Sequence, residues 1–234
     1  TSWSWLENTE NMKYVLDLKV RVENGESILY VSTGTYSYEG STFGASGLYR
    51  STDDGQTFTE VVNGSGQGLS PGRLSVAKQD NVLWVPGLNG QIYELEANEI
   101  EATFVYNTSG ERVELDVSQE FPDVIFAVYE TNNTVGQVIK SSNSGESWVT
   151  VNEPLDPENG IPDNDFSRGQ AWYDLHIKIN PQDTNNVLTG AVNLFKTTDG
   201  AQSWEKISSW WESDPSELYV HADQHEAIFY NGSS

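Results

Sequence analysis

The chain has 234 residues, 36% of them hydrophobic, which is enough to bury the core of one large domain or two small ones. Its 12 basic and 35 acidic residues give a formal net charge of −23, which excludes nucleic acid as a partner because most of the surface would repel a polyanion. The absence of cysteine excludes disulfides, a thiol nucleophile and a Cys-ligated metal site. Abundant aromatic residues and 20 Gly favour strands and tight turns, so the composition predicts an all-β protein.

One short signature, S/T-x-D/N-x-G/A-x-S/T-aromatic, occurs three times along the chain. Each copy stands between a short apolar run and a run that begins with the aromatic residue, which predicts a hairpin turn. We expect the acidic or amide side chain to accept backbone N–H bonds and the aromatic ring to pack between sheets. The turn positions are Ser51, Asp53, Gly55 and Phe58, then Ser141, Asn143, Gly145 and Trp148, then Thr197, Asp199 and Trp204.

The spacing of these turns fits a repeat of about 45 residues, which is typical of propeller blades built from four antiparallel strands. The predicted blades span residues 14–62, 73–107, 112–151 and 172–208, and the second lacks the turn signature. Loops are expected at 36–47 and 152–170. Residues 1–13 are predicted to end a preceding blade and residues 219–234 to supply the first strand of a further blade. The sequence therefore predicts an incomplete fragment of a larger β-propeller ring.

The three turns resemble the Asp-box, or BNR, repeats of sialidases, sortilin-type domains and the two-propeller xyloglucanases of glycoside hydrolase family 74. Residues 167–230 are similar to large secreted bacterial BNR-repeat proteins, which often carry a type IX secretion sorting domain. That likeness rests on Ser-Arg-Gly-Gln-Ala-Trp-Tyr-Asp-Leu, Asn-Leu-Phe-Lys-Thr-Thr-Asp-Gly and Tyr-Val-His-Ala-Asp-Gln-His in this order. The resemblance implies an Asp-box propeller that is secreted or held at the outer surface of a bacterial cell.

The enzymes among these families have motifs that can be sought here. Sialidases use three arginines, one of them in Arg-Ile-Pro, and no arginine of this chain stands in that motif. The xyloglucanases carry a catalytic Asp in a Thr-Asp-x-Gly-Gly-like motif. Its nearest match, Thr52-Asp53-Asp54-Gly55, already belongs to a predicted turn. The catalytic Asp of those enzymes is therefore not transferred to this sequence.

The first strand of each propeller blade lines the central channel, so aligning these strands predicts which side chains face it. We align Asp17 in Leu16-Asp17-Leu18 with the central residues of 74–76, 115–117, 173–175 and 224–226. Strand alternation adds residues two positions away to the same face. The predicted channel residues are Asp17, Ser75, Asp116, Asp174, His176, His221, Asp223 and His225, which include all three histidines.

Three interpretations of this polar cluster stay open. In the first, the side chains tether adjacent blades through hydrogen bonds to neighbouring backbones. A divalent cation is the second interpretation, with zinc on His221, Asp223 and His225 or calcium on the aspartates. Acid–base catalysis is the third, with Asp116 and Asp174 as candidates because crowded carboxylates shift apart in pKa.

The combined prediction is a secreted or cell-surface propeller module that binds a polysaccharide or a cell-surface protein without catalysis. One alternative is a glycoside hydrolase with part of its active site outside this chain, and another is a structural spacer of a large surface protein. The remaining blades of the same protein are a further expected partner. No apolar run reaches about 18 residues, so no transmembrane segment is expected.

Overall fold

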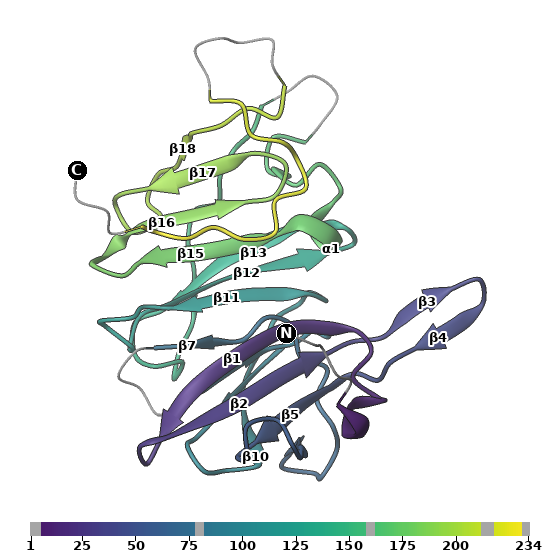
Figure 1. The fold of residues 1–234 in the computed structure, drawn as a ribbon. Coiled ribbons are helices and arrows are strands. Elements are labelled where there is room, and N and C mark those ends of the chain that lie inside the picture. Colours follow the sequence, from purple (N-terminus) through teal and green to yellow (C-terminus); the bar gives the residue numbers. More distant parts are fainter. Residues whose placement is uncertain (1–5, 78–81, 158–161, 212–217, 231–234) are drawn as a thin grey trace.

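The computed structural model describes residues 6–77, 82–157, 162–211 and 218–230, and these are almost entirely β (Figure 1). Helical structure in these ranges is limited to the 3₁₀ turn η1 (Glu7–Thr9) and one turn of α-helix, α1 (Ala171–Asp174). Within the same ranges, no helix has the length and apolar character needed to cross a membrane.

Sixteen of the strands form four blades of four antiparallel strands. The outer strands of the first two blades also pair in parallel, which joins these two blades into one eight-stranded sheet. Blade one contains β1 (Val15–Glu23), β2 (Glu26–Thr33), β5 (Gly47–Ser51) and β6 (Thr59–Asn63). Blade two contains β7 (Ser75–Val76), β8 (Leu83–Pro86), β9 (Gln91–Leu95) and β10 (Glu101–Asn107). Blade three contains β11 (Val113–Val117), β12 (Ile125–Thr131), β13 (Thr134–Ser141) and β14 (Val149–Thr150). Blade four contains β15 (His176–Asn180), β16 (Asp183–Gly190), β17 (Leu194–Thr197) and β18 (Glu205–Lys206).

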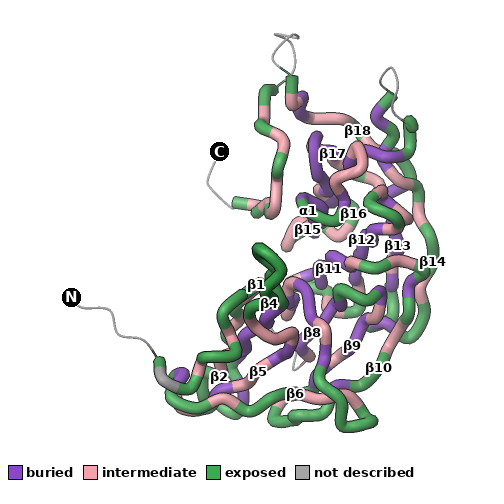
Figure 2. Tube along the Cα trace, turned by 90° about the vertical axis from the view of Figure 1, so that its right-hand side faces the viewer, coloured by how far each residue is buried: buried purple, intermediate pink, exposed green. Residues whose placement is uncertain are grey.

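The blades follow one another as a fan, with blade one at the bottom and blade four at the top of Figure 1. In Figure 2 the first strands β1, β11 and β15 lie toward the concave side, and β10 and β14 lie toward the convex side. This arrangement is an incomplete β-propeller, as the repeat predicted. On β1, Leu18, Val20 and Val22 are 56%, 60% and 66% exposed, so this strand presents an apolar face that no described blade covers.

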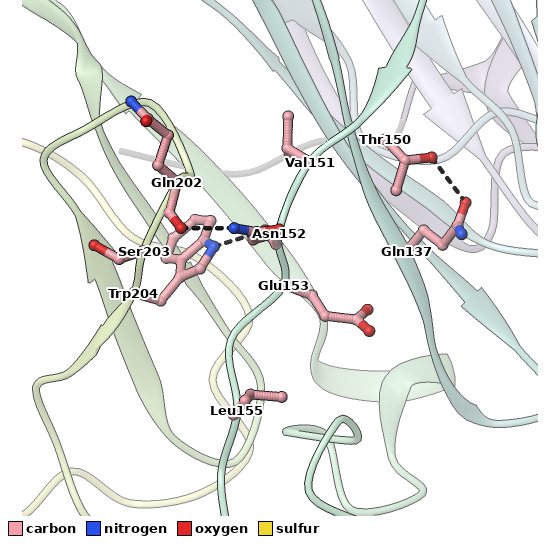
Figure 3. A pocket seen from close by; sticks show the side chains of 9 residues that line it. All are labelled: Gln137, Thr150, Val151, Asn152, Glu153, Leu155, Gln202, Ser203 and Trp204. Carbon is pink, nitrogen blue, oxygen red and sulfur yellow. Dashed lines mark hydrogen bonds between the residues drawn. The ribbon is translucent and has the colours of Figure 1, made fainter.

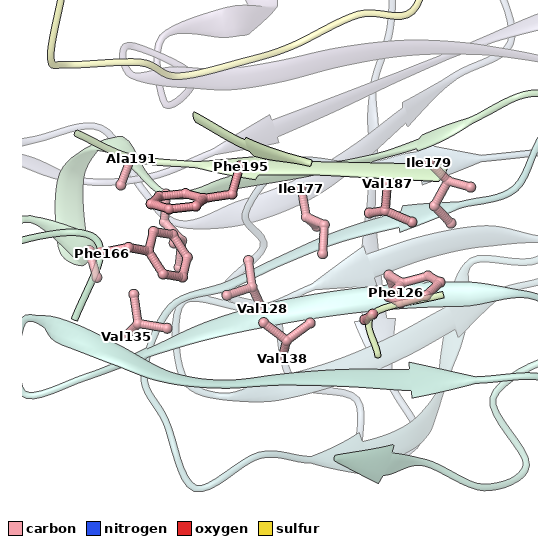
Figure 4. Close-up of a cluster of buried hydrophobic side chains, with 13 residues drawn as sticks. Phe126, Val128, Val135, Val138, Phe166, Ile177, Ile179, Val187, Ala191 and Phe195 are labelled. Atoms are coloured by element: carbon pink, nitrogen blue, oxygen red, sulfur yellow. The ribbon is translucent and has the colours of Figure 1, made fainter. Parts of the chain in front are cut away.

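Hydrophobic side chains fill the space between consecutive blades. Between blades three and four, Phe126 and Val128 of β12 belong to one cluster with Ile177 and Ile179 of β15 (Figure 4). Similar clusters lie between blades two and three and between blades one and two. Because the apolar area is buried between sheets, each blade depends on its neighbour for its core.

The three signature turns share one hydrogen-bond pattern. In each, the first hydroxyl accepts the amide four residues later, and the acidic or amide side chain accepts the amide four residues after itself. The bonds to the hydroxyl join Ser51 and Gly55 (2.9 Å), Ser141 and Gly145 (2.9 Å), and Thr197 and Ala201 (3.0 Å). The bonds to the acidic or amide side chain join Asp53 and Thr57 (2.8 Å), Asn143 and Ser147 (3.1 Å), and Asp199 and Ser203 (2.9 Å). Hydrogen bonds from Ser203, led by its hydroxyl, lower the pKa of Asp199 to about 2.

Gly145 tests how tightly the second turn is packed. It has a φ of +81°, and a Cβ there would lie 2.6 Å from the ring of Trp84, which is 1% exposed. Gly55 has a φ of +84°, but its added Cβ would meet nothing closer than 3.8 Å. We expect Gly145→Ala to lower the free energy of unfolding by about 2–4 kcal/mol, because left-handed strain and overpacking add. Gly55→Ala should cost only about 1 kcal/mol. Urea denaturation compares them, and equal losses would contradict the packing argument.

Three segments differ from the sequence prediction. Residues 171–174 form α1 rather than the first strand of blade four, because the Gln170 carbonyl accepts the amides of Tyr173 (2.8 Å) and Asp174 (3.2 Å). Residues 221–230 belong to no strand, since no described strand pairs with them. The predicted loop 36–47 contains a hairpin, β3 (Tyr36–Tyr38) and β4 (Ser41–Phe43), which projects from blade one in Figure 1. Residues 1–5 and 231–234 of the predicted flanking blades lie outside the described ranges.

Candidate functional site

Polar side chains of the first strands connect each blade to the next. The three bonds run from the Leu74 amide to Asp17 (2.9 Å), from the Val117 amide to Ser75 (3.1 Å) and from the Ile179 amide to Asp116 (2.9 Å). Ser75 also donates to Asp116 at 3.1 Å. At these three positions the geometry is that of a tether between adjacent blades, which is one of the interpretations left open by the sequence.

The alignment of Asp174 with Asp116 is wrong. Lys178 occupies the equivalent position in blade four, because the Ile179 amide follows it just as the Val117 amide follows Asp116. The Lys178 Nζ lies 3.5 Å from Asp116 Oδ1 and 3.7 Å from Glu226 Oε1. The equivalent positions of the four first strands are therefore Asp17, Ser75, Asp116 and Lys178. The charge of the lysine is shared between two carboxylates.

Asp174 and His176 lie in the interior, where they are 0% and 2% exposed. Within the described part of the chain, neither carboxylate oxygen of Asp174 nor either ring nitrogen of His176 has a hydrogen-bond partner. Burial raises the pKa of Asp174 from 3.8 to about 7 and lowers the pKa of His176 from 6.5 to about 4, so it favours the neutral form of each. Asp116 is also only 6% exposed. Neither predicted catalytic carboxylate is open to a substrate.

The C-terminal histidines are not gathered around a metal position. His221 and Asp223 are exposed, with 3.9 Å between Nδ1 and Oδ2. The His225 ring instead packs edge-on against Tyr173, with 4.6 Å between ring centroids. In the ranges that the structure describes, no group of three His, Asp or Glu side chains is arranged to hold an ion. A bound calcium or zinc ion stays a prediction.

Two neighbouring cavities lie where the first strands meet. The smaller, of about 120 Å³, is lined by first-strand residues of blades one, three and four, by Arg73 and Leu74 just before β7, and by Glu226. The larger, of about 380 Å³, shares Leu16, Arg73 and Glu114 with it, and we call it the mouth pocket. The mouth pocket is lined by Tyr14, Val15, Leu16, Gly72, Arg73, Leu88, Arg112, Glu114, Trp172, Tyr173 and His225.

Two rows of aromatic rings reach the mouth pocket. The tyrosine row runs from Tyr38 through Tyr36 to Tyr14, with centroid separations of 6.5 and 5.9 Å. The tryptophan row consists of Trp172 and Tyr173, 5.3 Å apart, and the His225 ring against Tyr173. The Tyr and Trp side chains of both rows are between 43% and 58% exposed. The pocket is thus bordered by exposed rings from distant parts of the sequence.

Arg112 holds the tryptophan row in place. Its Nε and Nη2 donate to Glu114 Oε1 at 2.9 and 2.7 Å, and its guanidinium also donates to the carbonyls of Ala171 (3.4 Å) and Leu175 (3.1 Å). Ala171 is the first residue of α1 and Leu175 directly follows it, so the arginine fixes the helical turn that carries Trp172. Sequence reasoning did not single out Arg112, Arg73 or the aromatic rows.

A second depression, the rim groove, has a volume of about 490 Å³ and lies between β14 and the turn before β18 (Figure 3). The Asn152 side chain donates to the Gln202 carbonyl at 2.6 Å, and the Trp204 indole donates to the Asn152 carbonyl at 2.7 Å. Across the groove, Thr150 donates to Gln137 at 3.2 Å. Apart from Glu153, whose buried Oε2 has no hydrogen-bond partner among the described residues, these polar groups bond within the protein and join blades three and four. The mouth pocket, with its exposed rings, is the better candidate for a ligand site.

No protein-family model matches the chain, and no curated protein matches it. Among solved structures, an ancestral GH74 enzyme gives a TM-score of 0.60 at 18% identity, over 92% of this chain and 26% of that one. The Niastella koreensis GH74 enzyme gives 0.50 at 18% identity, over 83% and 30%. YCF48 from Cyanidioschyzon merolae gives 0.52 at 13% identity, over 87% and 58%. These likenesses establish the β-propeller fold alone, and the chain spans about a quarter of the first structure.

Proposed function

We propose that this chain is part of a secreted or outer-surface bacterial propeller of the Asp-box kind, and that its mouth pocket binds an extended polysaccharide without catalysis. The observation that carries the proposal is the pair of exposed aromatic rows at the pocket. Contiguous exposed apolar surface is uncommon on soluble proteins and marks interaction sites. Tyr and Trp rings suit a ligand that is apolar on one face and polar at its edges, as a sugar ring is.

The arrangement of the rows favours a chain-like ligand. The tyrosine row continues from the pocket along the β3–β4 hairpin, whereas the tryptophan row lies on α1. A polymer could therefore stack on several rings in succession and place one sugar in the pocket. The hydrolase alternative loses support because Asp116 and Asp174 are buried. A spacer would not need the exposed rings.

The aromatic rows can be tested by replacing one ring from each. We expect Trp172→Ala and Tyr14→Ala each to weaken polysaccharide binding about tenfold, because each removes one stacking surface worth about 1 kcal/mol or more. Affinity electrophoresis and calorimetry against a panel of soluble polysaccharides measure the change. Phe121→Ala is the matched control, since Phe121 is 50% exposed and lines none of the described pockets.

Two results would overturn the proposal. The first is that the wild-type protein binds no polysaccharide of the panel. The second is that the two variants bind as the Phe121→Ala control does. If a surface protein is captured by the same rows instead, the ligand is a protein and the polysaccharide proposal fails.

A further inference from the structure

Arg73 differs from the other arginines of the chain. Each of the other four forms an ion pair with a carboxylate: Arg21 and Arg50 with Glu23, Arg112 with Glu114, and Arg168 with Asp156. No described residue forms an ion pair or hydrogen bond with the Arg73 guanidinium. In a chain of net charge −23 an arginine would readily find a carboxylate, so this half-buried cation has its donors left for another group.

The place of Arg73 in the blade explains why its own chain does not neutralise it. Arg73 comes just before β7, two residues before Ser75, and Glu114 of β11 lies two residues before Asp116 in the next blade. Glu114 is the carboxylate that lines both cavities with Arg73, but Arg112 already donates to it through two nitrogens. Asp17 and Glu226 also line the smaller cavity, but they pair with Lys19 (3.6 Å) and Lys178 (3.7 Å), so no carboxylate of the described residues that line either cavity is left to neutralise Arg73.

We propose that Arg73 binds a carboxylate of the ligand, so that the mouth pocket selects an acidic, uronate-bearing polysaccharide over a neutral one. This rests on the proposed function, because the aromatic rows supply the stacking and Arg73 supplies the selection. A guanidinium presents two parallel N–H donors that match a carboxylate, which gives directional recognition as well as attraction. An acidic peptide would meet the same guanidinium, but the rows of exposed rings beside it favour sugar rings.

The overall negative charge does not prevent this binding. At physiological ionic strength, charges on the surface act over about 8 Å, so acidic residues remote from the pocket are largely screened. The charged side chains that line the mouth pocket are Arg73, Arg112 and Glu114, and the adjoining cavity adds Asp17, Lys19, Lys178 and Glu226. Together these are four basic and three acidic side chains, which sum to a positive charge. The pocket is therefore a local exception on an acidic protein, and an acidic polymer would be held there and repelled elsewhere. The charge distribution therefore directs an acidic polymer to the mouth pocket.

The test compares one polymer in two charge states. The probes are polygalacturonate and the same polymer after chemical reduction of its carboxyl groups, measured by calorimetry with the whole chain. We expect wild type to bind the acidic form at least tenfold more tightly, and Arg73→Gln to weaken acidic binding about 10- to 100-fold while leaving the reduced polymer unchanged. Arg73→Lys should recover part of the loss. Lys196→Gln, which removes a positive charge outside the described pockets, should change neither affinity.

Several outcomes separate this inference from the proposed function. Equal affinity of wild type for both polymers would overturn the carboxylate inference and leave polysaccharide binding intact. Equal weakening of both polymers by Arg73→Gln would show that Arg73 only shapes the pocket, and would also overturn it. Binding of neither polymer, with Arg73-dependent binding of a poly-glutamate peptide, would overturn both proposals in favour of a protein ligand. Unchanged thermal melting of each variant shows that the fold is retained.

Discussion

Glu23→Ala is expected to lower the free energy of unfolding by about 3–5 kcal/mol, because it leaves two arginines without their shared carboxylate in the interior. Glu23 is 2% exposed and accepts bonds from Arg21 (2.8 Å), Arg50 (2.6 Å), the Asn98 amide (2.8 Å) and the Tyr30 hydroxyl. Arg21 also donates to the carbonyls of residues 95 and 96 in blade two. Removing the carboxylate thus weakens the joint between two blades as well as the pairs themselves.

The matched control is Glu26→Ala, because Glu26 lies opposite Glu23 in the β1–β2 register but is exposed. Urea denaturation should place this control within about 0.5 kcal/mol of wild type. A similar loss in both variants would mean that the hairpin end, and not the buried network, is what matters. Tyr30→Phe removes the hydroxyl that donates to Glu23 and accepts from Arg21 and Arg50 but keeps the carboxylate, so its loss should lie between those of the two glutamate variants.

The pH dependence gives an independent check of the same carboxylate. Burial raises the pKa of Glu23, but the bonds from Tyr30, Arg50, the Asn98 amide and Arg21 outweigh it and lower the pKa from 4.5 to about 2. A lowered pKa in the folded state contributes stability that is complete above pH 4.5 and is lost as the pH falls toward 2. The difference in the free energy of unfolding between wild type and Glu23→Gln should therefore shrink as the pH falls from 4.5 toward 2.

The fold was predictable from the sequence because its strongest signals are local. The hydroxyl of Ser51 and the amide of Gly55 are four residues apart, so the turn that they form can be recognised in a single window. Three such turns at propeller spacing confirm the prediction of an all-β propeller. The incomplete ring followed from the same repeat arithmetic.

The register of blade four was not predictable from residue identity. Asp174 was matched to Asp116 because both are aspartates, whereas the first strand of blade four, β15, begins only at His176. The alternation of Ile177 and Ile179, both buried, would have indicated the correct register and placed Lys178 in the ring. A polar residue type is a weaker guide than apolar alternation, since burial of one strand face fixes the register.

The mouth pocket was beyond sequence reasoning for a different reason. Tyr14, Arg73 and Trp172 come from three separate segments, which only the fan of blades brings to one place. Their local signals were weak, because a single exposed aromatic residue is ordinary on a protein surface. That no described residue pairs with Arg73 is a property of the folded chain and has no signature in the sequence.

Asp174→Asn is expected to stabilise the protein at pH 8 by about 2–4 kcal/mol relative to wild type, because the variant needs no buried charge. Burial raises the pKa of Asp174 to about 7, Arg112 opposes the shift, and Asp223 and Asp165 add to it. A folded-state pKa raised above its ordinary value of 3.8 means that the stability of wild type is fully present below pH 3.8 and is lost as the pH rises through 7. The amide side chain of the Asp174→Asn variant does not ionise, so the variant does not lose this stability as the pH rises.

Thermal and urea denaturation of wild type and Asp174→Asn between pH 4 and 8 measure the difference directly. The two proteins share His176, whose lowered pKa of about 4 destabilises the fold as the pH falls below 6.5, so that effect cancels in the difference. Asp54→Asn is the matched control, because it makes the same carboxylate-to-amide change at an exposed turn position with φ 57°, where Asn is well tolerated. A flat difference for Asp174→Asn would mean that the carboxylate is ionised and satisfied in the interior. A rise between pH 4 and 8 would instead show that Asp174 is neutral in the folded interior at low pH and that its ionisation destabilises the fold.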